Sequence, residues 1–303
     1  MRTPRRRYPP AVGEATSVGQ SLLGDGPGSW RLRQLRGVAR VAFPWNLFWD
    51  QRLVVLSLVR SQIARRHRRS ILGWAWNLIQ PGSQAVLLFV ATKGALRVPG
   101  GSGSDLAGFG IFFAAFIIAQ GMGEIVNRGP ALVTERPAWV KGSLFPLELL
   151  APTAVGVALY RIIPGGLLGV AIVALGNGPA AGLTTLISFV LGLALAIVWG
   201  TSLALAFAAV GVYVRDAVLA APILTLGMIF ISPLYLDPAA GGVAGLLVRL
   251  NPLTVPMEFI LQGLPIVAQS PTEIILGVVG AFVSLWVASA LFRRLSGGFA
   301  DYV

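Results

Sequence analysis

The side chains best suited to chemistry in this sequence are basic, and they gather immediately before an apolar segment. Residues 65–69 read Arg-Arg-His-Arg-Arg, and the chain turns apolar from Ile71 onward. A guanidinium offers a fork of N–H donors that matches phosphate oxygens, so this cluster could bind a lipid phosphate. Arginines beside a membrane-spanning helix also keep that side of the helix in the cytoplasm. Both interpretations fit the cluster, and the sequence alone does not choose between them.

The sequence offers little for catalysis. It has no cysteine and a single histidine, His67, which excludes thiolate nucleophiles and a histidine-rich metal centre. Neither of the two lysines follows a glycine, so a phosphate-binding loop of the form G-x-x-x-x-G-K-S/T is absent. No Asp-x-Asp pair is available to hold Mg²⁺. We therefore expect no catalytic residue, no metal site and no cofactor bound by this chain.

Composition indicates an integral membrane protein. Of the 303 residues, 55% are hydrophobic and only 12% are charged, whereas soluble domains average about 25% charged residues. The net charge of +12 arises mainly in residues 1–69, where 14 arginines stand against three acidic residues. This asymmetry suits a cytoplasmic face against anionic membrane lipids. No nucleic-acid-binding module accompanies the charge, so we expect no nucleic-acid partner.

The apolar segments predict an all-α protein with six transmembrane helices within residues 71–295, since about 20 apolar residues span a bilayer core. The expected spans are about 72–96, 107–126, 147–175, 183–211, 218–236 and 274–292. Basic residues fall in alternate loops, which places both termini in the cytoplasm of a multi-pass plasma-membrane protein.

Three segments complete the expected organisation. Residues 1–42 form a disordered basic tail, residues 43–70 form an amphipathic interface helix, and residues 296–303 form a C-terminal cytoplasmic tail. Residues 237–273 are too apolar for a simple loop and too interrupted by proline and glycine to span. We predict a re-entrant helical hairpin there, between the fifth and sixth spans. A surface loop with two amphipathic helices is the alternative.

Two further features could serve transport. Arg161 falls within the third span, where a charge usually faces a cavity or a partner, although it could instead snorkel to an interface. Aromatic rings could stack on sugars along a path, while packed-core or lipid-facing rings are the commoner situation. The candidates for such a path are Phe112, Phe113, Phe116, Tyr160, Arg161, Trp199, Phe230 and Tyr235.

Five short motifs follow one another along the chain. They are Arg65–Gly73 with Trp76 and Pro81, Phe145-Pro146, Arg215-Asp216, Ser232-Pro233-Leu234-Tyr235, and Asn251-Pro252-Leu253-Thr254. In this order they resemble the motifs of polysaccharide-exporting ABC-2 type permeases, which export O-antigen, teichoic acid or galactan chains on polyprenyl diphosphate. The resemblance covers about residues 48–295. It departs from the family pattern at Ser61, where an acid is common, and at His67, where tyrosine is usual.

The resemblance implies a homodimer in contact with membrane lipids. Two separate cytosolic ABC ATPase subunits would bind ATP and Mg²⁺. The loop after the second span would contact the ATPase through Glu135, Arg136 and Lys141. The lipid diphosphate would be held at a cytoplasmic gate, and its residues would be Arg65, Arg66, Arg68, Arg69, Ser70, Leu72 and Gly73.

The expected function is therefore that of the permease subunit of an ABC exporter. It would move a polyprenyl-diphosphate-linked polysaccharide out of the cytoplasm for cell-wall biogenesis. Arginine outnumbers lysine 22 to 2, as in GC-rich bacterial genomes, which favours the galactan precursor of arabinogalactan over an O-antigen-like glycan. The alternatives are a membrane enzyme that handles polyprenyl phosphate and an ABC-2 permease for a drug or lipid.

Overall fold

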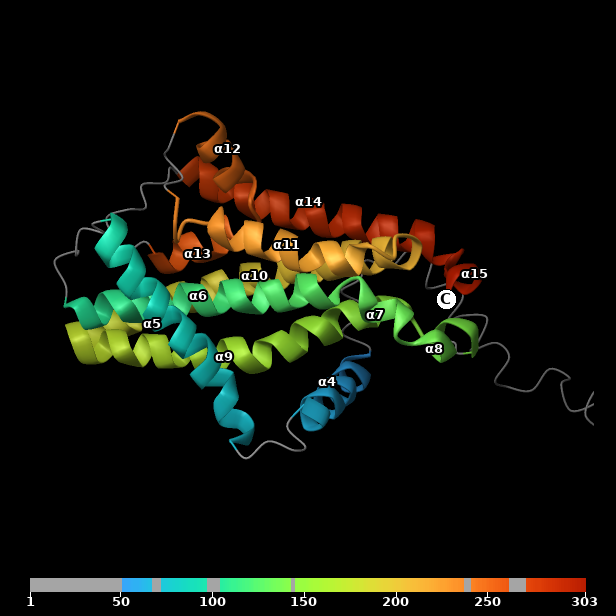
Figure 1. Cartoon of the computed structure of the whole chain (residues 1–303), viewed down its shortest axis with the longest axis horizontal. Coiled ribbons are helices and arrows are strands. Elements are labelled where there is room, and N and C mark those ends of the chain that lie inside the picture. The colour runs from blue at the N-terminus through green and yellow to red at the C-terminus, as the bar shows by residue number, and fades with distance from the viewer. Residues whose placement is uncertain (1–50, 67–71, 97–103, 143–144, 237–240, 262–270) are drawn as a thin grey trace, which may run out of the picture. The chain divides into compact units, whose positions relative to one another are not determined.

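The computed structural model describes residues 51–66, 72–96, 104–142, 145–236, 241–261 and 271–303. The predicted tail 1–42, the first part of the predicted interface helix, and Arg68, Arg69 and Ser70 lie outside the described residues. Within the described residues all regular structure is helical, as Figure 1 shows. This confirms the all-α prediction for the part of the chain described.

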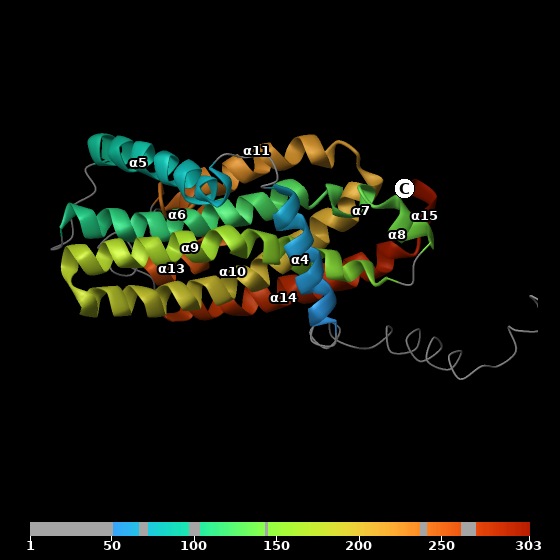
Figure 2. The same ribbon diagram turned by 90° about the horizontal axis from the view of Figure 1, so that it is seen from below.

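Four long helices run alongside one another and form the body of the fold (Figures 1 and 2). They are α6 (Asp105–Arg128), α9 (Leu150–Asn177), α10 (Pro179–Tyr213) and α14 (Pro271–Ser296). Each contains a stretch long and apolar enough to cross a membrane. In α6, 78% of that stretch is buried inside the molecule, so α6 is the central helix.

Two shorter apolar helices flank this body. α5 (Trp76–Leu96) packs against α6 and contains Pro81, and α11 (Ala217–Phe230) packs on another side of α6. α11 has 14 residues, which is fewer than the roughly 20 that span a bilayer core. α5 and α11 correspond to the predicted first and fifth spans, but neither is both long enough and apolar enough to count among the candidate spans.

The segment 237–273, where a re-entrant hairpin is predicted, contains a sharply bent pair of helices, which could be a broken span or a re-entrant loop. α12 (Gly242–Leu250) and α13 (Thr254–Leu261) meet at an angle of 94°. Asn251, at the bend, donates from Nδ2 to the carbonyl oxygens of Met228 (2.7 Å) and Ile231 (3.0 Å). These carbonyls belong to the C-terminal end of α11, so the amide satisfies groups that a helix end leaves unpaired. The described residues thus contain four candidate spans, or five if the bent pair counts as one.

Close backbone contact holds α6 against α9. A Cβ atom at Gly110 would lie 2.8 Å from the carbonyl oxygen of Gly169, and one at Gly169 would lie 2.8 Å from that of Gly110. Small residues at facing positions let membrane helices approach closely and gain van der Waals contact. At the end of this pair, Asn177 Oδ1 accepts a hydrogen bond of 3.0 Å from the backbone N–H of Ser104. This hydrogen bond links the start of α6 to the end of α9.

A tight turn connects α9 to α10. Gly178 alone separates the helices, and its φ of +88° lies in the region that glycine tolerates best. Pro179 then begins α10, where its missing N–H costs no hydrogen bond. The two longest helices consequently run in opposite directions side by side.

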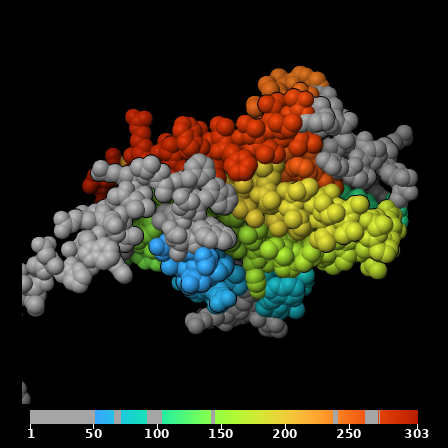
Figure 3. All heavy atoms as spheres, turned by 180° about the vertical axis from the view of Figure 1, so that it is seen from behind, coloured from blue at the N-terminus to red at the C-terminus, as the bar shows by residue number. Residues whose placement is uncertain are grey.

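Within the predicted interface helix 43–70, the described residues form α4 (Arg52–Arg66), which runs across the long helices (Figure 2). Val55 and Val59 are buried, and α4 packs on α9. Leu53 and Leu56 are exposed on the same helix. Large apolar side chains are also exposed on α10 and α14, which share the face seen in Figure 3. Such surfaces suit contact with lipid.

Candidate functional site

The polar segment after α6 folds into two short helices. They are α7 (Ala131–Thr134) and α8 (Pro137–Gly142), followed by a 3-10 turn at Leu147–Leu149 that leads into α9. Arg136, between the two helices, donates from Nη1 to the carbonyl oxygen of Leu132 at 2.8 Å. Its guanidinium carbon lies 5.5 Å from the centre of the Trp139 ring. The hydrogen bond to Leu132 and the contact with the Trp139 ring together hold the Arg136 side chain in place.

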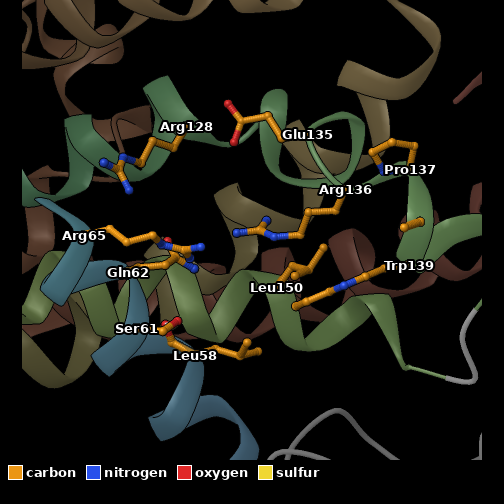
Figure 4. A pocket seen from close by; sticks show the side chains of 11 residues that line it. Leu58, Ser61, Gln62, Arg65, Arg128, Glu135, Arg136, Pro137, Trp139 and Leu150 are labelled. Atoms are coloured by element: carbon orange, nitrogen blue, oxygen red, sulfur yellow. The ribbon is translucent and has the colours of Figure 1, made fainter.

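A pocket of about 740 Å³ opens between this segment and α4. Figure 4 shows Arg65 and Arg136 extending toward each other from opposite sides, with Arg128 beside Arg65 and Glu135 on the side of Arg136. The residues that line the pocket are Leu58, Ser61, Gln62, Arg65, Arg128, Glu135, Arg136, Pro137, Ala138, Trp139 and Leu150.

The pocket carries excess positive charge. Three of its lining residues are arginines and one, Glu135, is acidic. Burial lowers the pKa of Arg136; Glu135 opposes this shift, and the positive charges of Arg65 and Arg128 add to it. Arg136 remains protonated, since arginine pKa values stay far above neutral pH in proteins. The three cations therefore repel one another, and an anion between them would relieve the repulsion.

Arg161 is buried in the helix bundle, as its position in an apolar span suggests. Its side chain is 11% exposed, and its Nη2 lies 3.5 Å from Oε2 of Glu124 on α6. Glu124 Oε1 also lies 3.5 Å from Nε of Arg128, one turn further along α6. This carboxylate connects α9 to the arginine that lines the pocket. The sequence singled out Arg161 but did not predict its pairing with Glu124.

The predicted gate residues fall in different places. Arg65 lines the pocket and Arg66 is the last residue of α4. Leu72 is half-exposed just before the 3-10 turn Gly73–Ala75, where Gly73 has a φ of +47°. Among the predicted coupling residues, Glu135 and Arg136 line the same pocket as Arg65, and Lys141 is exposed on α8.

The predicted path residues do not gather around one space. Phe112, Phe113 and Phe116 are buried and pack with Ala85 of α5. Tyr160 and Trp199 are half-buried. Phe230 and Tyr235 form a separate ring contact, 5.1 Å between centroids, at the end of α11. In this conformation the three phenylalanines contribute to the core of one chain.

Of the residues that line the pocket, only Arg65, Glu135 and Arg136 were predicted as site residues; Gln62, Arg128 and Trp139 are among those that were not. Within residues 128–137, the only basic residues are Arg128 and Arg136. Two arginines separated by a segment that begins with Gly129-Pro130 were the sequence feature that could have indicated this part of the pocket. Residues 296–303, predicted as a C-terminal cytoplasmic tail, include α15 (Phe299–Tyr302), where Phe299 is fully buried and the helix packs against α8.

These features define a helical membrane protein with a basic pocket at one end of its helix bundle. The profile of the ABC-2 type transporter family matches residues 54–264, which include most of α4, the pocket and the bent pair. The chain belongs to the ABC-2 type transporter family. No curated protein matches the chain. Membership makes the chain the membrane-spanning permease component of an ABC transporter, which associates with an ABC ATPase.

Proposed function

We propose that this chain is the permease subunit of an exporter for a polyprenyl-diphosphate-linked polysaccharide. The galactan precursor of arabinogalactan is the favoured cargo, and an O-antigen-like glycan is the second. Two copies of the chain form the channel, and two ATPase subunits bind ATP and Mg²⁺ and drive export from the cytoplasm. The chain itself carries out no catalytic step.

The observation that carries this proposal is the basic pocket at the end of α4. A diphosphate-linked lipid presents its charges at the membrane surface, where arginine forks suit its oxygens. Arg65, Arg128 and Arg136 meet there beside a helix suited to the interface. The remaining gate candidates are Arg66, Arg68, Arg69, Ser70, Leu72 and Gly73, and the coupling candidates are Glu135, Arg136 and Lys141.

The directions of the helices support six crossings with both termini in the cytoplasm. Arg65 and Arg128 line one pocket, yet α6 begins at the opposite end of the bundle. The chain between α4 and α6 would then have to cross the membrane, and α5 is the helix in that part of the chain that could do so. Tyr213 at the end of α10 donates to the carbonyl oxygen of Leu295 at the end of α14 (2.7 Å), so both helices end at the same side.

A further membrane crossing is needed between α10 and α14, because both helices end at the same side of the bundle. Only α11 and the bent pair α12–α13 occupy this part of the described chain. We assign this crossing to α11 together with the turn that follows it. We assign the bent pair to a re-entrant position in the outer leaflet. Asn251 would then hold the re-entrant pair against the outer end of α11 through two hydrogen bonds.

Depletion of the protein tests the cargo. Lipid-linked glycan should accumulate on the cytoplasmic side of the membrane when the permease is depleted, and it should disappear from that side on complementation. The partner is tested by co-expressing the chain with candidate ATPases from the same genome and purifying the complex. Failure of every candidate ATPase to bind would contradict the transporter mechanism.

One observation favours a second candidate, an ABC-2 permease for a lipid or drug. Phe112, Phe113 and Phe116 are buried in the core of one chain, so they offer no sugar-stacking surface in this conformation. Under this alternative, depletion leaves lipid-linked glycan unchanged and alters lipid distribution or drug sensitivity. Product formation by the purified chain without an ATPase would instead identify a membrane enzyme.

A further inference from the structure

Aromatic side chains anchor α15 (Phe299–Tyr302) to the helix bundle. Phe299 is fully buried, and its ring meets that of Phe292 on α14 edge to face, with 5.4 Å between the centroids. The Tyr213 ring, at the end of α10, lies 6.0 Å from that of Phe299 and 4.7 Å from that of Tyr302. A helix of four residues has too few internal hydrogen bonds to persist alone. These ring contacts therefore set the position of α15.

The turn from α14 into α15 is also built around Tyr213. Its hydroxyl donates to the carbonyl oxygen of Leu295 at 2.7 Å, and that carbonyl also accepts from the backbone N–H of Gly298 at 3.1 Å. A Cβ atom at Gly298 would lie 2.7 Å from the Tyr213 hydroxyl oxygen. Glycine at this position lets the tyrosine approach the turn, so α15 leaves α14 in a defined direction.

α15 is the main support that α8 (Pro137–Gly142) receives from a distant part of the sequence. Within the described residues, α8 has its most extensive helix contacts with α7, its neighbour in the chain, and with α15. Figures 1 and 2 show α8 and α15 next to each other at one end of the bundle. Trp139 and Val140 of α8 are half-buried against the core to which Phe299 belongs. With six residues, α8 also depends on such contacts to stay in one position.

A fixed position matters for a segment that a partner protein binds. Glu135, Arg136 and Lys141, the proposed ATPase contacts, lie in α8 or directly before it. Ordering a mobile segment on binding costs free energy, and this cost weakens the affinity. A contact that already holds α8 in place removes the cost, so the partner binds more tightly.

We propose that α15 holds α8 in the position in which the ATPase binds it, with Phe299 as the positioning residue. The ATPase-binding surface of the permease then depends on residues 297–303 as well as on the segment after α6. This inference rests on the proposed function only in taking α8 and the residues before it as the ATPase contact, and it is independent of the exported cargo.

Hydrogen–deuterium exchange of the full chain in nanodiscs tests the contact between the two helices. Phe299→Ala should accelerate exchange in α8 by about tenfold or more, because a buried phenylalanine usually contributes more free energy than a factor of ten represents. Exchange in α6 should stay unchanged. The matched control is Phe189→Ala, which removes a buried ring that lies against Gly166 of α9 and should leave exchange in α8 as in the wild type. Unchanged exchange in α8 of the Phe299→Ala variant would overturn the proposal.

Affinity for the ATPase tests the consequence. With the ATPase that co-purifies with the wild-type chain, Phe299→Ala should weaken binding by about tenfold or more, because α8 must then be ordered on binding. Phe299→Leu keeps most of the buried volume and should restore most of the affinity. Phe189→Ala should lower the unfolding temperature and leave the affinity unchanged. If Phe299→Ala and Phe189→Ala weaken binding equally, overall stability determines the affinity, and the proposal is wrong.

Two milder variants complete the test. Tyr213→Phe keeps the ring and removes the hydrogen bond to Leu295, so it should weaken ATPase binding by about threefold. Should Phe299→Ala not fold, normal binding and normal α8 exchange in Tyr213→Phe would overturn the proposal. Asp301→Asn changes an exposed side chain of α15 and should bind the ATPase as tightly as the wild type. A loss of affinity in Asp301→Asn equal to that in Phe299→Ala would make α15 itself part of the docking surface and would overturn its positioning role.

The failure of this inference and that of the proposed function are distinguishable. If an ATPase binds the wild-type chain and all the variants equally, the transporter mechanism stands and this inference alone is wrong. If no ATPase binds the wild-type chain, the proposed mechanism is wrong, and so is the ATPase part of this inference. Faster exchange in α8 of the Phe299→Ala variant would then establish only the contact between the two helices.

Discussion

At the scale of single residues, the pairing of Glu124 with Arg161 explains how a charge is tolerated inside an apolar bundle. Both side chains are 11% exposed and their nearest charged atoms are 3.5 Å apart. Removing ions from water is strongly unfavourable unless each finds a partner of opposite sign. Glu124 also contacts Arg128, so one carboxylate serves both a buried and a half-exposed arginine. Through Arg128, the pair is connected to the pocket that Arg128 lines.

Replacing Glu124 should destabilise the protein because it leaves Arg161 buried without this carboxylate. We expect Glu124→Gln to lower the free energy of unfolding by about 3–5 kcal/mol, the usual range for breaking a buried pair from one side. The double substitution Glu124→Gln/Arg161→Gln should recover much of that loss. Thermal unfolding in detergent measures both. Exposed Glu135→Gln is the control, and an equal loss there would contradict the explanation.

At the scale of helices, the hydropathy pattern predicted where the long helices lie. It did not predict which residues meet to form the pocket. The second span was expected at 107–126 and the helix covers Asp105–Arg128, because a long apolar run bounded by polar residues has few alternatives. The apolar pattern of α6 does not reveal which face meets a neighbour, so the burial of Phe112 and Phe116 was not predictable. The pocket was hidden for a related reason, since it joins α4 to a segment more than 60 positions away.

The contact between α6 and α9 should fail when its glycines acquire side chains. Gly110→Ala would place a Cβ atom 2.8 Å from the Gly169 carbonyl oxygen and 2.9 Å from the backbone nitrogen of Val173. Backbone cannot move aside as a flexible side chain can, so we expect a loss of about 1–3 kcal/mol, as for other overpacked interiors. The measurement is thermal unfolding of the purified complex.

Gly227 provides the matched control for this substitution. It lies within α11, and a Cβ atom there would meet nothing within 4 Å. Alanine has the higher helix propensity, so Gly227→Ala should leave the unfolding temperature unchanged or raise it slightly. If Gly110→Ala behaved like Gly227→Ala, close packing of the α6 and α9 backbones would not be what holds these helices together.

At the scale of the whole molecule, charge is distributed unequally between the two ends of the bundle. Arg128, Arg215 and Arg294 lie at the end where α6, α10 and α14 terminate. Toward the opposite end, where α6 begins and α9 turns into α10, the described residues include Asp105 and two basic residues, Lys93 on α5 and Arg249 on α12. Positive charge in short loops is retained in the cytoplasm during insertion. In the proposed orientation, with both termini in the cytoplasm, the pocket faces the cytoplasm, where an ATPase and a newly made lipid-linked substrate would both be available.

This orientation can be measured cleanly because the chain contains no cysteine. Ala180→Cys, at the exposed start of α10, should react with a membrane-impermeant maleimide in intact cells. Val214→Cys, at the exposed turn after α10, should react only after the membrane is permeabilised. Both substitutions are at exposed positions outside the pocket, so neither should disturb folding. The reverse pattern would place the three arginines outside the cell, where neither ATP nor a cytoplasmic lipid-linked glycan could reach them, and would remove the physical basis of the proposed transport direction.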